Sequence, residues 1–183
     1  MATLEDAIEI AAQAHAGQVD KAGSPYILHP LRVMLRVEGV HERIAAVLHD
    51  IVEDTPMGFE ELRLLGFPEE VLQAVCALTK KPGETRMMAA KRAAMDPIAR
   101  AVKIADVTDN MNLSRIEQPT EHGLERQEEY KKVLALLSAK KSPRRLNGCA
   151  TRQAFCGQRG SCIYSHHARQ HVQDSYESTI PVR

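Results

Sequence analysis

The sequence predicts an all-α protein, and two features of its residue pattern support this fold class. Apolar residues recur at helical spacing through most of residues 3–139. No segment alternates apolar and polar residues for long enough to suggest a strand. The chain has 183 residues, which suits one domain with a buried core rather than two large catalytic domains. We therefore expect a compact helical bundle over residues 1–140, followed by an irregular extension over residues 141–183.

Start and stop signals divide the bundle into separate helices. Thr3 suits the N-cap of the first helix, and Gly17 suits its end. Pro30 fits the first turn of the second helix, and Pro56 stops the third because the residue before a proline avoids the helical conformation. Pro97 marks a further start. The expected helices cover residues 4–15, 30–39, 41–54, 58–65, 68–79, 85–95, 97–115 and 120–140.

The charge is distributed unevenly along the chain, although its formal total is zero. Residues 1–140 hold 17 Lys and Arg against 22 Asp and Glu, whereas residues 141–183 hold 7 against 2. An acidic body argues against broad nucleic-acid binding, which needs clustered basic side chains. A small anionic ligand can still bind if a metal ion supplies the positive charge.

The N-terminus and the cysteines indicate the cellular compartment. Acidic residues follow Met1 where a secretory signal would be basic, and no apolar run approaches membrane-spanning length. These features predict a cytoplasmic protein without a membrane segment. Cys76 lies in an apolar helical pattern and is expected to be a buried structural thiol.

Four ionisable residues lie close together in the third expected helix. At about 100° per residue, His49, Asp50, Glu53 and Asp54 share an arc of roughly 140°. Such a face resists burial unless a divalent cation neutralises it or water reaches it. A solvated helix end is the alternative, but acids at a helix C-terminus oppose the helix dipole.

Two further residues complete a possible metal site. His29 precedes Pro30, where a histidine satisfied within the core is the alternative interpretation. Asp106 lies in an apolar helical stretch, where a buried carboxylate needs a strong partner. Together His29, His49, Asp50 and Asp106 would form a mixed nitrogen and oxygen shell suited to Mn²⁺, Fe²⁺ or Zn²⁺.

These ordered residues resemble a known family. The succession of His29, His49-Asp50 and Asp106 is similar to the metal signature of the HD superfamily. The surrounding motifs resemble the hydrolase domain of the Rel/SpoT family and its stand-alone small alarmone hydrolases, over roughly residues 4–138. The motifs that carry this resemblance cover residues 14–18, 23–30, 48–55 and 102–110.

The resemblance implies a function and roles for individual residues. It implies an HD domain over residues 1–140 that removes the 3′-pyrophosphate of the alarmone ppGpp, with Mn²⁺ held by His29, His49, Asp50 and Asp106. Glu53 and Asp54 match the acidic pair beside the metal-bound water, with Glu53 as the first choice of base. The resemblance adds Tyr26 and Asn110 as substrate-binding residues, with Asn110 at the sugar.

One position departs from the family pattern. The alarmone hydrolases usually have an Arg-Lys pair in the loop before residue 23, and this chain has Asp20-Lys21. Lys21 can still bind a phosphate, but a carboxylate cannot stack on a guanine base as an arginine does. Hydrolysis of another phosphorylated nucleotide or of NADPH therefore stays open, as does a nucleotide sensor without turnover. The oligomeric state stays open as well.

The C-terminal extension has the composition of a disordered tail. It contains Lys, Arg, Gly, Gln and Ser without an apolar period. Three cysteines and a histidine pair are zinc-type ligands, but their spacing does not resemble paired Cys-x2-Cys hooks. These ligand-type residues are Cys149, Cys156, Cys162, His166 and His167. We expect a basic extension without a role in the chemistry of the domain, and no segment is long enough to be a synthetase domain.

Overall fold

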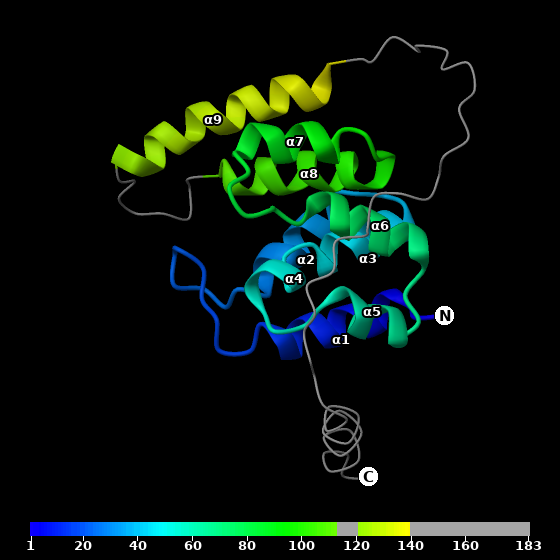
Figure 1. Cartoon of the computed structure of the whole chain (residues 1–183). Coiled ribbons are helices and arrows are strands. Elements are labelled where there is room, and N and C mark those ends of the chain that lie inside the picture. The colour runs from blue at the N-terminus through cyan, green and yellow to red at the C-terminus, as the bar shows by residue number, and fades with distance from the viewer. Residues whose placement is uncertain (113–120, 140–183) are drawn as a thin grey trace, which may run out of the picture. The chain divides into compact units, whose positions relative to one another are not determined.

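The structure is a computed structural model of the whole chain, and it describes residues 1–112 and 121–139 (Figure 1). Within these ranges, helices are joined by turns, and the β-structure consists of one isolated bridge between Val19 and Pro25. The prediction of an all-α fold is therefore confirmed. None of the helices in these ranges is long and apolar enough to cross a bilayer.

The first helix, α1 (Leu4–Ala14), begins at the predicted cap. The Thr3 hydroxyl accepts a hydrogen bond from the Asp6 amide at 3.2 Å, and the Asp6 carboxylate accepts one from the Thr3 amide at 2.7 Å. This reciprocal pair satisfies two amides that the first turn would otherwise leave exposed. The second helix, α2 (Leu28–Met34), ends before the predicted residue 39 because the chain turns there and buries Val37.

The predicted third helix is interrupted where the candidate ligands occur. It consists of α3 (Val40–Leu48) and the single turn α4 (Ile51–Asp54), with His49 and Asp50 between them. His49 Nδ1 donates to the carbonyl of Ala46 at 2.7 Å, and a continuous helix would use that carbonyl for the amide of residue 50. The expectation of one unbroken helix to residue 54 was therefore wrong at this point.

Five further helices follow α4 within the described residues. The bounds of the remaining helices agree with the predicted ones to within about five residues, and α8 ends at Asn110 rather than at the predicted residue 115. Pro97 occupies the first position of α8, and Asp96 caps it by accepting from the Ala99 amide at 2.8 Å. These helices are α5 (Phe59–Leu64), α6 (Glu69–Leu78), α7 (Arg86–Ala93), α8 (Pro97–Asn110) and α9 (Glu121–Ser138).

Helix α3 lies at the centre of the bundle and packs against α1, α2, α6 and α8. The larger hydrophobic core forms between these helices around fully buried residues such as Leu48, Val75 and Val102. A smaller core joins α7, α8 and α9 around Val107 and Leu137. Figure 1 shows α9 lying across α7, on the side away from α1. Helix α8 contributes to both cores and so connects them.

Residues 1–141 form one compact unit. The predicted disordered character of residues 141–183, including their cysteines and histidines, concerns residues outside the described ranges.

Candidate metal centre

The four predicted ligands converge from three places in the fold. His29 comes from the first turn of α2, His49 and Asp50 from the break between α3 and α4, and Asp106 from α8. His29 Nε2 lies 3.4 Å from Asp106 Oδ1 and 3.7 Å from Asp50 Oδ2. His49 Nε2 lies 3.0 Å from Asp50 Oδ2 and 3.8 Å from Asp106 Oδ1. Ligand atoms of His29, His49 and Asp106 all lie within 4.8 Å of one another, which is close enough to hold one metal ion.

The ring of His49 is oriented by the backbone. A carbonyl oxygen only accepts hydrogen bonds, so the bond to Ala46 fixes the proton on Nδ1 and leaves a lone pair on Nε2. That Nε2 atom is buried and has no hydrogen-bond partner among the described residues. Its neighbour at 3.0 Å is Asp50 Oδ2, a carboxylate oxygen that only accepts, so a proton or a cation between the two atoms would satisfy both.

The ring of His29 is oriented by a second carboxylate. His29 Nδ1 donates to Asp109 Oδ2 at 2.9 Å, which turns Nε2 toward Asp50 and Asp106. Asp109 is completely buried and also accepts from Arg32 Nε at 3.0 and 3.2 Å. Carboxylate-to-histidine hydrogen bonds of this kind position imidazole ligands around metal ions.

The electrostatics of the four groups favour a bound cation. Burial lowers the pKa of His49, but the carboxylates of Asp50 and Asp106 outweigh it and raise this pKa to about 9. Burial raises the pKa of Asp50, but His49 lowers it to about 2. Two carboxylates stay ionised here beside two imidazoles, so a cation can replace the imidazole proton as the compensating charge.

Asp106 has two further partners on its own helix. Lys103 Nζ donates to its Oδ2 at 2.9 Å, and the Asn110 amide donates to its Oδ1 at 2.5 Å. Burial raises the pKa of Asp106, but Lys103 and the two histidines hold it well below its usual range. Asn110, which was predicted to contact the sugar of the substrate, thus donates a hydrogen bond to the candidate metal ligand Asp106 in this structure.

The acidic pair lies beside the ligands. Glu53 Oε1 accepts a hydrogen bond from the Lys80 amide at the end of α6. Asp54 Oδ2 lies 3.3 Å from the Tyr26 hydroxyl, which also donates to Asp50 at 2.5 Å. Burial and the nearby charge of Asp50 raise the pKa of Asp54. Tyr26, which was predicted to bind substrate, thus connects the candidate metal ligand Asp50 to Asp54 of the acidic pair.

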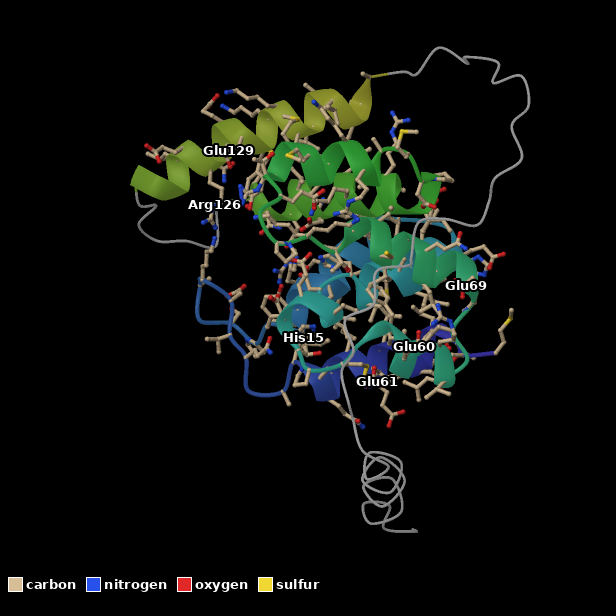
Figure 2. All side chains as sticks on the ribbon, viewed as in Figure 1. His15, Glu60, Glu61, Glu69, Arg126 and Glu129 are labelled. Carbon is tan, nitrogen blue, oxygen red and sulfur yellow. The ribbon has the colours of Figure 1, made fainter. Side chains whose placement is uncertain are left out.

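The motif at residues 14–18 lies behind the acidic pair. His15 Nδ1 lies 2.9 Å from Gln18 Oε1, and the Gln18 amide donates to the carbonyl of Asp54 at 3.1 Å. The His15 ring also lies 4.8 Å from the Tyr26 ring. Figure 2 shows His15 below α4, at the end of α1. These contacts fix the backbone turn that presents Glu53 and Asp54.

Three basic side chains form a rim around this region. Lys21 comes from the loop after α1, Arg86 from the start of α7, and Arg126 from α9. Burial lowers the pKa of Lys21, and the positive charges of Arg126 and Arg86 lower it further. Figure 2 shows Arg126 extending from α9 toward the loop of Lys21. We call Lys21, Arg86 and Arg126 the basic rim; within it, Arg86 also pairs with Glu129 of α9 at 2.5 Å.

Asp20 takes part in the structure of the same loop. Its Oδ1 accepts hydrogen bonds from the amides of Ala22 at 2.9 Å and Ser24 at 3.0 Å. Its Oδ2 lies 3.9 Å from Arg32 Nη2. Asp20, the residue that departs from the family pattern, thus closes a turn of its loop and faces the guanidinium of Arg32 on α2.

Comparison with known proteins now identifies the domain. The family model for the HD domain matches residues 26–111, and these include all four candidate ligands. This match agrees with the resemblance of the order of histidines and aspartates to the HD superfamily. A solved structure of a metazoan orthologue of SpoT that hydrolyses ppGpp has a TM-score of 0.63 at 24% identity. That match covers 75% of this chain and 85% of the other, and it supports the same fold.

Several curated relatives are longer proteins. The chain is 36% identical over 132 residues to the probable GTP pyrophosphokinase of Mycobacterium leprae, which is 65% of this chain and 17% of that protein. It is 35% identical over 120 residues to the guanosine-3′,5′-bis(diphosphate) 3′-pyrophosphohydrolase of Aquifex aeolicus, which is 59% of this chain and 17% of that protein. The recognised resemblance to the Rel/SpoT family is confirmed, and the matched region is about a sixth of these relatives.

Sequence reasoning missed three residues that support the ligands. Asp109 and Arg32 orient His29, and Lys103 pairs with Asp106. Asp109 carried a usable signal, since it lies three residues after Asp106 in an apolar helix and needs a partner for the same reason. Arg32 carried no such signal, because its partners are 12 and 77 residues away in sequence.

Proposed function

We propose that this chain is a Mn²⁺-dependent phosphohydrolase that removes the 3′-pyrophosphate of ppGpp. The observation that carries the proposal is the cluster of His29, His49 and Asp106, whose ligand atoms lie within 4.8 Å of one another, with Asp50 Oδ2 3.0 Å from His49 Nε2. Hydrogen bonds from Nδ1 orient both imidazole rings. Relatives named as guanosine-3′,5′-bis(diphosphate) 3′-pyrophosphohydrolases support the choice of substrate.

His29, His49, Asp50 and Asp106 would hold the metal ion. Two nitrogen and two oxygen ligands leave coordination positions for solvent and substrate, and such a mixed shell suits Mn²⁺. When bound, the ion supplies a water of lowered pKa and polarises a phosphate oxygen. The buried Nε2 atom of His49 supports this assignment, because it faces carboxylate oxygens of Asp50 and Asp106, and a cation between these groups would satisfy all three.

Glu53 is the proposed general base. The Lys80 amide fixes one of its carboxylate oxygens, so the other can accept a proton from the attacking water. Asp54, which is held by Tyr26 and supported by Gln18, would orient that water or protonate the leaving oxygen.

The basic rim would bind the phosphates of the substrate. Lys21, Arg86 and Arg126 come from three separate elements, and burial, together with the charges of Arg126 and Arg86, lowers the pKa of Lys21. A phosphate beside Lys21 would supply a counter-charge, and Arg86, which already pairs with Glu129, would add its positive charge to the same region. The sugar would then lie near Asn110, whose amide contacts Asp106.

A second candidate substrate class follows from Asp20. The carboxylate of Asp20 closes its own loop and faces Arg32, so position 20 offers no planar cation for a guanine base. Hydrolysis of another phosphorylated nucleotide or of NADPH would use the same metal site and basic rim.

A substrate panel tests both candidates. Purified protein is assayed with Mn²⁺ against ppGpp, GTP, dNTPs and NADPH, and we expect turnover of ppGpp. The variants His49→Ala and Glu53→Gln should abolish this turnover, because they remove a metal ligand and the base. Activity on NADPH or dNTPs without activity on ppGpp would keep the metal chemistry and overturn the alarmone assignment.

Matched controls separate chemistry from folding. His41→Ala removes an exposed histidine of α3, and Glu70→Gln changes an exposed acid of α6. Both controls should retain activity. Turnover that survives both His49→Ala and Glu53→Gln would contradict the mechanism. Binding of ppGpp without turnover in the wild type would indicate a nucleotide sensor instead.

A further inference from the structure

We propose that Arg32, Asp20 and Asp109 are positioning residues that link the loop of Lys21 to the metal ligand His29. We call these three residues the Arg32 bridge. The inference rests on the metal site of the proposed function. It adds that position 20 influences metal affinity without touching the metal.

The inner end of the Arg32 bridge is a buried carboxylate. Asp109 is completely buried, and it accepts hydrogen bonds from His29 Nδ1 at 2.9 Å and from Arg32 Nε at 3.0 Å. Both partners of Asp109 are donors, one of them a guanidinium, which is the surrounding that suits a carboxylate. A buried charge needs a paired cation, and Arg32 is the near one because Arg36 is 3.9 Å away.

The outer end of the Arg32 bridge is the loop after α1. Arg32 Nη2 lies 3.9 Å from Asp20 Oδ2, and this nitrogen is buried without a hydrogen-bond partner in the described part of the chain. The other oxygen of Asp20 accepts from the amides of Ala22 and Ser24. One guanidinium therefore spans two carboxylates, one in the loop of Lys21 and one behind His29.

A consequence for residue 20 follows from this geometry. A carboxylate at position 20 attracts Arg32 and holds the loop turn, whereas an arginine there would place a second cation beside Arg32. Movement of Asp20 would shift the guanidinium between its two partners and so change the hydrogen bond that orients His29. The Arg32 bridge thus couples the loop that presents Lys21 to the geometry of the metal ligand.

Titration calorimetry with Mn²⁺ on the full chain tests this coupling. Asp109→Asn should weaken Mn²⁺ binding by about 10-fold to 100-fold, as is typical when the partner of a ligating histidine is changed. Asp20→Asn keeps an oxygen for the loop turn but removes the charge, and we expect weakening of up to about fivefold. The double variant Asp20→Asn with Arg32→Gln should bind Mn²⁺ as weakly as Arg32→Gln alone, because both changes break one linkage.

Controls make each outcome decisive. Glu38→Gln removes an exposed carboxylate near α2 and should leave Mn²⁺ affinity unchanged. Melting temperatures identify variants that fail to fold. If Asp109→Asn is one of them, the Mn²⁺ affinities of the Asp20→Asn and Arg32→Gln double-mutant cycle test the proposal on their own. Additive effects in that cycle, or unchanged affinity in Asp20→Asn, would overturn the Arg32 bridge and leave the proposed function intact. Wild-type protein that binds no Mn²⁺ would overturn both proposals.

Discussion

The ligand cluster is more deeply buried than the basic rim of the same domain. The side chains of His29, His49 and Asp106 are at most 8% exposed, and each is fixed by a hydrogen bond from its own surroundings. The rim of Lys21, Arg86 and Arg126 is partly or fully exposed and comes from a loop and two outer helices. Packing therefore determines the metal geometry, whereas the phosphate contacts depend on charge and can change without disturbing the fold.

The largest effect should come from removing a buried ligand. Asp106→Ala deletes one of the four candidate ligands and the partner of Lys103 and Asn110. We expect no Mn²⁺ binding detectable by calorimetry and no hydrolysis. Asp106→Asn conserves the shape of the side chain and checks whether the loss comes from charge rather than from misfolding. If both variants keep the wild-type affinity for Mn²⁺, the ion binds at a different place in the protein.

The packing that supports the ligands can be weakened without touching them. Leu48 is completely buried beside His49, and Leu48→Ala should lower the free energy of unfolding by about 2–5 kcal/mol. Urea denaturation measures this loss. Leu64 is 75% exposed, and Leu64→Ala should change stability by no more than about 0.5 kcal/mol. Equal losses of unfolding free energy in the two variants would show that packing around Leu48 contributes no more to stability than the exposed side chain of Leu64.

The basic rim should affect substrate binding alone. Lys21→Ala removes one charged contact to phosphate, worth roughly 1.5 kcal/mol, and should raise KM about tenfold with little change in kcat. Mn²⁺ affinity should stay at the wild-type value. Lys131→Ala is the control, because Lys131 pairs with Glu128 on α9 and is 60% exposed. An equal fall in kcat would instead assign Lys21 to the chemical step.

The smallest effect sharpens the contrast between stability and chemistry. Thr3→Ala removes the cap of α1 and should cost about 1 kcal/mol of folding free energy. Thermal unfolding should record a lower Tm, while the Mn²⁺ affinity stays constant. If the Mn²⁺ affinity fell as well, the geometry of the ligand cluster would depend on the stability of the whole fold. That result would contradict the view that local hydrogen bonds fix the ligands.

Sequence patterns predicted the helices and the candidate ligands because both have local signals. Thr3 and Pro97 mark helix starts through the chemistry of their own side chains, and the spacing of His49 and Asp50 is visible in one segment. The sequence did not predict the break between α3 and α4, because it depends on a side chain that competes for a backbone carbonyl. Helical periodicity alone continues through that position.

The support behind the ligands could not be predicted in the same way. Arg32 contacts Asp109 across 77 positions, and the local sequence of α2 does not specify that partner. Lys80 approaches Glu53 through its backbone amide, and the identity of a side chain carries no information about such a contact. Tertiary packing brings these groups together, so only a three-dimensional arrangement reveals them.

The single turn α4 has a consequence for how such a site can evolve. The carbonyl of Asp50 accepts the amides of both Glu53 at 3.2 Å and Asp54 at 2.9 Å, so a ligand and two acids share one backbone unit. An insertion or deletion inside this unit would displace the acids relative to the ligand, and natural variation should therefore replace side chains here while conserving the spacing. Changes in substrate preference would accumulate instead in the loop after α1 and along α9, where length and charge can vary independently of the reacting groups.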